Sequence, residues 1–473
     1  MTAETSFHCA ALSHYAREEH VIMKKNLTGK EYVYVASMLF GMFFGAGNLI
    51  FPVHMGQLAG QNIIQAVIGF LIAGVGLPLM GVAALGISKC SGLYELSMRV
   101  SRPYAVFFTC LLYLTIGPFF CIPRCATVSF TVGLENVLPA GHAKLYLMLF
   151  SAAFFAAVLF FSLNPGKILV YVGKVLNPVF LLFLAVLVIV ALLSPAASAF
   201  SIVPSGDYAV HPFFTGILEG YNTMDVLASL AFGIVVIQVI RGLGVERAED
   251  ISVCTVRAGI FSCLLMAFIY LAVTVVGAQS RGIFETSDNG GIALAQIAQH
   301  YLGGFGLIIL AATVTLACLK TAVGLTTSCA ETFTQLFPKS TGYRGWAIIF
   351  SSVSFLIANV GLNAIIEFAV PVLMFLCPLA VVLIALTLTG RLFGNDRRVY
   401  RWAIGFTLPA SVCALLAALP DGAIAALHLE KFNLAVHTFL PLASLGLGWV
   451  CPAAVGFAVG LIAHFAHCRR KTA

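Results

Sequence analysis

Twelve long apolar runs divide this sequence, and almost all of the charged side chains stand between them. A helix needs about 20 apolar residues to cross a bilayer, where only internal hydrogen bonds can satisfy its backbone. Charged residues make up only 10% of the chain, against about a quarter in soluble domains. The pattern therefore predicts an all-α polytopic membrane protein with twelve transmembrane helices. The runs cover residues 32–59, 61–88, 104–137, 145–163, 168–194, 213–241, 253–279, 304–336, 343–361, 363–389, 402–420 and 438–463.

The lysines and arginines test this number of runs, because basic residues concentrate in cytoplasmic loops. Of the 26 in the chain, Lys144, Arg281 and Lys431 fall on one side of a twelve-span arrangement, two fall within runs, and the remaining 21 fall on the other side. We therefore expect both termini in the cytoplasm. The net charge of +7 then faces anionic lipid, and no nucleic-acid partner is needed to explain it. Met1 and Met23 are both candidate translation starts.

The first run is interrupted by the segment Gly45-Ala46-Gly47-Asn48. Three glycines within seven residues weaken a helix, and Pro52 adds a further break. An alternative interpretation is a helix-packing face, in which the small residues Gly41 and Gly45 let another helix approach closely. That alternative leaves the asparagine within the apolar run unexplained.

The sixth run carries a comparable interruption, from Gly220 to Asp225. A carboxylate within a membrane span is expensive and usually functional. The alternative is that residues 213–225 lie in the outer interface, where water hydrates Asp225.

The two interrupted runs are five spans apart, and they enter the membrane from opposite sides. This relation is typical of transporters built from inverted repeats with discontinuous helices 1 and 6. Amides at a restarted helix can bind a carboxylate, and unwound carbonyls can hold an ammonium group or a cation. The expected organisation is a cytoplasmic segment (1–30), a first repeat of helices 1–5 (31–194), an outer loop (195–212), a second repeat of helices 6–10 (213–390), two further helices (391–465) and a cytoplasmic tail (466–473).

Several longer motifs resemble the bacterial branched-chain amino acid:cation symporter family over about residues 30–465. The resemblance implies uptake of leucine, isoleucine and valine, usually with sodium, across the bacterial inner membrane. It also implies the five-plus-five architecture of the leucine-transporter-type proteins, with no cofactor apart from the co-transported Na⁺ or H⁺. The motifs are Phe-Gly-Ala-Gly-Asn-Leu-Ile-Phe-Pro at 44–52, Leu-Thr-Ile-Gly-Pro-Phe-Phe at 114–120, Ile-Pro-Arg at 122–124, Gly-Tyr-Asn-Thr-Met-Asp at 220–225, Leu-Ala-Cys-Leu at 316–319 and Thr-Ala-Val-Gly-Leu-Thr-Thr at 321–327.

The resemblance also implies a set of substrate-binding residues at the two interruptions. In that set, the Ala46 and Gly47 amides hold the substrate carboxylate, and Tyr221 lies near the amino group. Phenylalanines form a wall around the aliphatic side chain, although ordinary helix packing explains any one of them equally well. The full set is Phe43, Gly45, Ala46, Gly47, Asn48, Phe119, Phe120, Gly220, Tyr221, Asn222 and Asp225.

For the cation, the resemblance implies a Na⁺ site formed by Gly41, Phe44, Ala317 and Thr321, in which Thr321 supplies a hard oxygen ligand. The adjacent Lys320 departs from the family pattern, where a second hydroxyl is expected. In one interpretation its ammonium replaces the cation, and transport is proton-coupled or uncoupled from sodium. In the other, Lys320 faces a neighbouring cavity or pairs with an acid such as Asp225 or Glu331, and sodium binds as usual.

Two charged residues are candidates for an outer gate: Arg124 in the third run and Glu367 at the start of the tenth. In the alternative, Arg124 and Glu367 each have a separate structural partner.

An enzyme would need a converging set of catalytic groups, and the histidines lie mainly at the chain ends and in loops. A channel would favour a repeated pore-lining filter. We therefore expect a transporter whose partners are an amino acid and the lipid bilayer, with no obligate protein partner.

Overall fold

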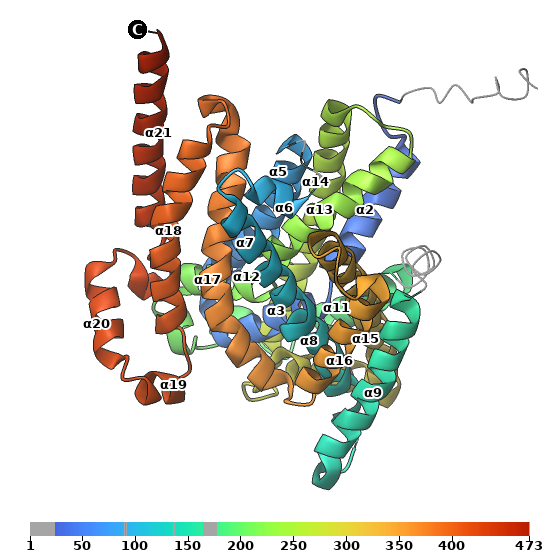
Figure 1. The fold of residues 1–473 in the computed structure, drawn as a ribbon. Helices are drawn as coiled ribbons and strands as arrows, with labels where there is room; N and C mark the ends of the chain where they lie inside the picture. The colour runs from blue at the N-terminus through green and yellow to red at the C-terminus, as the bar shows by residue number, and fades with distance from the viewer. Residues whose placement is uncertain (1–23, 89, 91, 136–137, 164–176, 473) are drawn as a thin grey trace, which may run out of the picture.

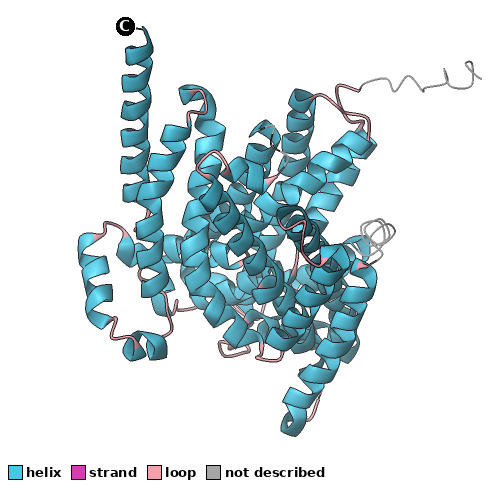
Figure 2. Ribbon diagram, viewed as in Figure 1, coloured by secondary structure: helices cyan, strands magenta, loops and turns pink. Residues whose placement is uncertain are grey.

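The computed structural model describes residues 24–472, apart from 89, 91, 136–137 and 164–176, and these residues form helices joined by turns (Figure 2). Short π-helical turns η2 (Ile72–Gly76), η3 (Thr115–Phe119) and η4 (Thr131–Glu135) interrupt two of the longer helices. The α-helices are α2 (Gly29–Phe43), α3 (Ala46–Ala59), α4 (Ile63–Leu71), α5 (Leu77–Ser88), α6 (Leu93–Ser97), α7 (Arg102–Leu114), α8 (Cys121–Phe130), α9 (Ala143–Ser162), α11 (Asn177–Leu193), α12 (Pro212–Asn222), α13 (Asp225–Gly242), α14 (Ala248–Ser280), α15 (Gly290–Leu336), α16 (Gly342–Ala358), α17 (Leu362–Thr389), α18 (Arg397–Ala417), α19 (Asp421–Ala426), α20 (Glu430–Phe439) and α21 (Val450–Thr472).

The predicted membrane spans coincide with this helical framework. Among the described residues, nine helical stretches are long and apolar enough to cross a bilayer, and Leu181–Leu193 and Gly342–Ala358 are shorter apolar helices. The start of the predicted span 168–194 lies outside the described residues. An all-helical protein with many membrane spans is therefore confirmed, whereas the number of twelve crossings stays a prediction.

The C-terminal region differs from its predicted boundaries. The run 438–463 was expected to be one span, but α20 ends at Phe439 and α21 begins only at Val450. Left-handed backbone at Leu442 and Gly446 turns the chain between these two helices. Helix α21 then continues to Thr472, so most of the expected tail 466–473 extends the last helix.

Helices from the two halves of the chain pack closely in the core. Helix α3 packs on α14, α4 on α12, and α5 on α13, which brings together the first, second, sixth and seventh predicted spans. Glycines permit the closest approaches: a Cβ on Gly277 would lie 3.0 Å from the Val53 carbonyl carbon, and a Cβ on Gly220 would lie 2.6 Å from the Ala73 Cβ. This packing holds the interruptions of the first and sixth runs in the centre of the molecule.

Both ends of the described chain lie at the same end of the bundle. Figure 1 shows the start of α2 and the end of α21 at the top of the view, with the α19–α20 pair at the opposite end. An even number of crossings would produce this arrangement.

Candidate substrate site

The first interruption separates α2 from α3. Phe44 leaves the helical conformation, with φ −74° and ψ 92°, and α3 restarts at Ala46. The Gly45 amide donates to Asn48 Oδ1 at 2.9 Å instead of to a carbonyl of α2. The first amides of a helix have no partner within that helix. The interruption therefore leaves the amides of Ala46 and Gly47, in the first turn of α3, without a hydrogen-bond partner inside that helix.

The second interruption separates α12 from α13. Met224 has a left-handed backbone with φ 65°, and Asp225 begins α13. The Thr223 hydroxyl donates to the Gly220 carbonyl at 2.9 Å and accepts from the Asp225 amide at 3.3 Å. These bonds hold the chain in a sharp turn at the depth where α3 restarts.

A buried hydrogen-bond network joins the two interruptions. Asn48 Nδ2 donates to Asp225 Oδ2 at 2.6 Å, and it also contacts the hydroxyl of Tyr270 on α14. The Tyr270 hydroxyl donates to the same Asp225 oxygen at 3.3 Å. All three side chains are 3% exposed or less. Asp225 is thus buried in the core, which removes the alternative of a hydrated carboxylate at the interface.

A small cavity lies against this network. Its free volume is about 20 Å³, enough for roughly one water molecule. A ligand larger than a water molecule would therefore fit only after the surrounding helices move apart. The cavity is lined by Met42, Phe43, Gly45, Gly47, Asn48, Ile116, Cys121, Arg124, Thr223, Met224, Asp225, Ala228, Phe232, Thr321 and Leu325.

Five of the predicted substrate residues line this cavity: Phe43, Gly45, Gly47, Asn48 and Asp225. Its apolar side also includes four residues from α13, α15 and the π turn η3 that no sequence pattern had indicated. These are Ile116, Ala228, Phe232 and Leu325.

Other predicted substrate residues lie elsewhere. Phe119 is 37% exposed and Phe120 packs beside it, and neither lines the cavity. Tyr221 is buried in the core away from the cavity, and Gly220 packs against α4 and η2. Asn222 lines a larger hollow on the other side of the α12–α13 turn.

Tyr270 is the member of the network that the sequence analysis missed. It stands in the middle of the apolar run 253–279, and its hydroxyl was the only available signal. Its role depends on the packing of α14 against α3, which cannot be predicted from the residues around Tyr270 in the sequence.

Of the predicted cation residues, the structure brings Thr321 of α15 beside the first interruption. Thr321 lines the cavity, and its hydroxyl donates to the Ala317 carbonyl at 3.2 Å. A Cβ on Gly45 would lie 3.4 Å from that hydroxyl oxygen. Gly41 and Phe44 are buried at the end of α2. Lys320 is half-buried and does not line the cavity.

The two candidate gate residues are not paired. Arg124 is 2% exposed, and its Nη1 donates to the Asn222 carbonyl at 2.7 Å while Nη2 donates to the Thr223 carbonyl at 3.3 Å. Glu367 is exposed and lines a hollow of about 490 Å³ together with Glu219 and Asp288. None of the ion pairs among the described residues joins Arg124 to Glu367.

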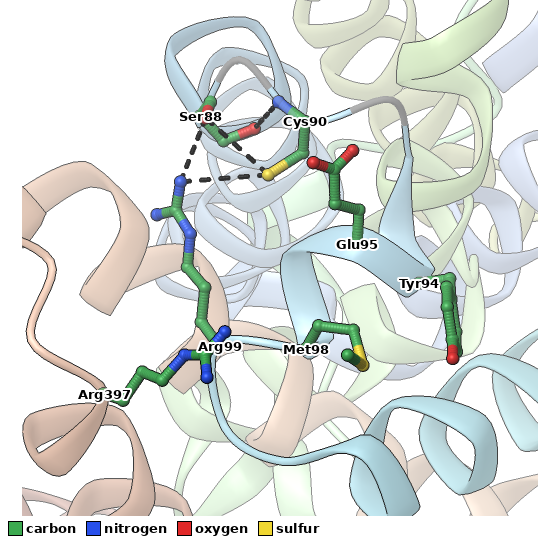
Figure 3. Close-up of a pocket in the computed structure, with 7 residues that line it drawn as sticks. All are labelled: Ser88, Cys90, Tyr94, Glu95, Met98, Arg99 and Arg397. Atoms are coloured by element: carbon green, nitrogen blue, oxygen red, sulfur yellow. Dashed lines mark hydrogen bonds between the residues drawn. The ribbon is translucent and has the colours of Figure 1, made fainter.

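Two further hollows lie towards the C-terminal end of α15 and beside α18. The first, of about 200 Å³, is lined by Gln238, Glu331 and Gln335 among others. The second, of about 600 Å³, contains Arg99, whose guanidinium donates to the Ser88 carbonyl at 3.0 Å (Figure 3). Neither hollow shares a residue with the central cavity.

The whole helical region matches one protein family. The family of branched-chain amino acid transport proteins matches residues 28–467. This chain belongs to that family. The transporter is 50% identical over 438 residues to the branched-chain amino acid permease BrnQ of Lactobacillus delbrueckii subsp. lactis, covering 92% of this chain and 97% of that protein. It is 39% identical over 437 residues to the branched-chain amino acid transport system 2 carrier protein of Pseudomonas aeruginosa, covering 92% and 97%.

Solved structures show the same fold at low sequence identity. Mhp1, a nucleobase-cation-symport-1 family transporter in a closed conformation with bromovinylhydantoin bound, superposes with a TM-score of 0.59 at 15% identity, covering 93% of each chain. MhsT in complex with L-phenylalanine superposes with a TM-score of 0.56 at 16% identity, covering 82% of this chain and 98% of that one. The relatives are named permeases and carriers, so the transporter is not an enzyme. The predicted resemblance to leucine-transporter-type proteins is confirmed at the level of the overall fold, whereas the twelve crossings and the inverted repeats stay predictions.

Proposed function

We propose that this transporter imports leucine, isoleucine and valine by cation symport, with the substrate bound between the two helix interruptions. The observation that carries the proposal is the 2.6 Å hydrogen bond from Asn48 to Asp225, which joins both interruptions in the buried core. The names of the relatives support the choice of branched-chain substrates.

A zwitterion fits the polar side of this site. The amides at the start of α3, from Ala46 and Gly47, face the substrate carboxylate, because a helix N-terminus attracts negative charge. The Asp225 carboxylate faces the ammonium group, since charge-assisted hydrogen bonds are the stronger ones. Asn48 and Tyr270 hold that carboxylate in place through their bonds to Oδ2.

An aliphatic side chain fits the opposite side. Phe43 and Phe232 lie with their ring centroids 6.1 Å apart, and Ile116 and Leu325 line the same cavity. Burial of a branched aliphatic side chain against this apolar surface contributes about 25 cal/mol of binding free energy per Å² removed from water. A polar side chain would lose its hydration there without gaining hydrogen bonds.

Sodium is the coupling ion that we favour. Its ligands would be the Gly41, Phe44 and Ala317 carbonyls and the Thr321 hydroxyl, a set of hard oxygens. Two observations support this choice: the Thr321 hydroxyl lies beside the α2–α3 interruption, and the Gly45 amide does not bond to the Gly41 carbonyl.

Proton-coupled or sodium-independent transport of neutral amino acids is the alternative. It rests on Lys320, which directly precedes Thr321 in α15. Successive residues of a helix point about 100° apart, and Lys320 does not line the central cavity. The different directions of Lys320 and Thr321 favour the hypothesis of sodium coupling over replacement of the ion by the Lys320 ammonium.

We further propose that the chain is a multi-pass protein of the bacterial inner membrane, with twelve crossings and both termini in the cytoplasm. Residues 31–194 and 213–390 would form two inverted repeats, and spans 1, 2, 6 and 7 would rock against the remaining spans during alternating access. The equivalent positions of the α2–α3 and α12–α13 interruptions support this organisation. Under this orientation, the hollow beside Glu367 opens to the outside.

The test is uptake of labelled leucine into proteoliposomes, with sodium, pH and membrane potential varied independently. We expect uptake that follows the sodium gradient and is inhibited by isoleucine and valine. Thr321→Val removes only the hydroxyl ligand and should raise the sodium concentration for half-maximal uptake at least about 10-fold, since a polar contact to a charged group contributes about 1.5–3 kcal/mol.

Lys320→Thr separates the two coupling mechanisms. Native uptake that ignores sodium, combined with sodium-dependent uptake by Lys320→Thr, would establish that the Lys320 ammonium replaces the ion. Equal sodium dependence in both proteins would exclude that role. If no aliphatic amino acid is taken up under any gradient, the substrate assignment is wrong.

A further inference from the structure

Arg124 has an unusual environment for a charged side chain in a membrane span. It lies near the start of α8 and is 2% exposed. Among the described residues, its hydrogen-bond acceptors are neutral carbonyl oxygens, those of Asn222 at 2.7 Å and Thr223 at 3.3 Å. Its guanidinium also lies over the ring of Phe51, 5.2 Å from the centroid. The guanidinium thus contacts the backbone carbonyls at the C-terminal end of α12.

The guanidinium of Arg124 makes no salt bridge with a carboxylate of the described residues, although Asp225 lines the same cavity. No ion pair among them includes Arg124, and its Nε is buried without a hydrogen-bond partner. Removing a cation from water costs several kcal/mol unless an anion or a full set of acceptors replaces the hydration. A buried guanidinium with a spare donor is therefore suited to receive an anion.

The place where an anion can reach Arg124 is the start of α3. A Cβ on Gly47 would lie 2.8 Å from Arg124 Nη2, so the guanidinium lies directly against the first turn of that helix. Both Gly47 and Arg124 line the central cavity. The helix N-terminus and the guanidinium therefore present positive potential to the same point.

We propose that Arg124 is the principal anchor for the α-carboxylate of the transported amino acid. In this structure its Nη groups donate to the carbonyls of Asn222 and Thr223. When substrate binds, the guanidinium turns to the carboxylate, with which a planar fork forms two parallel hydrogen bonds. This inference rests on the proposed function and adds a selection rule: ligands without a carboxylate are rejected, whatever their side chain.

The same movement links binding to the helix interruption. Transfer of the guanidinium from the α12 carbonyls to the substrate frees the end of α12, which the Asn222 bond otherwise ties to α8. The substrate thereby replaces a contact between the third and sixth predicted spans.

Equilibrium binding to the purified transporter tests the proposal. Labelled leucine is displaced by leucine, by leucinol, which lacks the carboxylate, or by 4-methylpentanoate, which lacks the ammonium group. We expect the native protein to prefer leucine to leucinol at least about 100-fold, as for other buried charge pairs. In Arg124→Gln, leucine affinity should fall by about that factor while leucinol affinity changes less than about threefold, because leucinol makes no charge pair with the guanidinium.

Arg281→Gln is the matched control, because Arg281 also donates to a carbonyl, that of Phe284 at 3.0 Å, but lies outside the cavity. It should leave the affinity for leucine unchanged. Arg124→Lys keeps the charge without the planar fork and should recover part of the preference for leucine over leucinol. It supplies the same comparison if Arg124→Gln does not fold, as judged by size-exclusion chromatography.

The outcomes separate the inference from the proposed function. Equal loss of leucine and leucinol binding in the Arg124 variants would reduce Arg124 to a structural residue and overturn the anchor. Unchanged leucine binding would also overturn it, while the transporter assignment stands. If the native protein binds no branched-chain amino acid at all, the proposed function and the anchor fail together.

Discussion

Replacement of Gly220 by alanine tests the close packing that positions the second interruption. A Cβ on Gly220 would lie 2.6 Å from the Ala73 Cβ and 3.0 Å from the Gly74 nitrogen. Carbon atoms rest about 3.5 Å apart at the closest, so α12 must move roughly 0.9 Å away from η2. Overpacking of this kind typically costs about 1–3 kcal/mol.

The same displacement has a consequence at the substrate site. The Asn222 carbonyl, two residues after Gly220, accepts from Arg124 at 2.7 Å. The N···O distance of an N–H···O bond is ordinarily no longer than about 3.2 Å. A shift of about 0.9 Å would lengthen the Arg124–Asn222 bond beyond that limit. We therefore expect Gly220→Ala to lose both stability and leucine uptake.

The assay compares Gly220→Ala with Gly324→Ala by thermal unfolding in detergent and by initial uptake rates in proteoliposomes. Gly324 lies within α15, and a Cβ there would meet no atom within 4 Å. The control should be neutral or slightly stabilising, because alanine restricts the unfolded chain more than glycine does. If Gly220→Ala unfolds no earlier than Gly324→Ala and transports normally, the reasoning is refuted.

Three other perturbations have defined outcomes. Asp225→Asn should weaken leucine binding about 10- to 100-fold, measured by displacement, because it removes the charge that faces the ammonium group; unchanged affinity would exclude that role. Arg99→Lys should lower the thermal midpoint by the equivalent of about 1 kcal/mol, because a lysine cannot span the end of α5 and the α17–α18 connection with several bonds at once. Burial raises the pKa of Asp396, but hydrogen bonds from the Arg398 amide and the His464 ring outweigh it and hold the pKa below its ordinary value. The resulting stabilisation is present above the unfolded pKa of about 3.9 and disappears as pH falls through the folded value, so native protein and Asp396→Ala should differ in midpoint near pH 6 and converge in stronger acid.

The sequence alone determined the features that depend on local composition. Long apolar runs identify membrane helices because each run must satisfy its own backbone in lipid. Glycine and polar residues at 45–48 and 220–225 mark interruptions because they weaken a helix wherever the chain goes afterwards. The structure places both interruptions where these patterns predicted, between α2 and α3 and between α12 and α13.

Only the tertiary structure decided which side chains meet at those interruptions. Asn48, Asp225 and Tyr270 come from three different helices, and their contact follows from the way α14 packs on α3. The position of Arg124 on the α12 carbonyls, rather than beside Glu367, has the same origin. Helix packing fixes these partners, since the direction and depth of a side chain in a bundle depend on residues distant in the sequence.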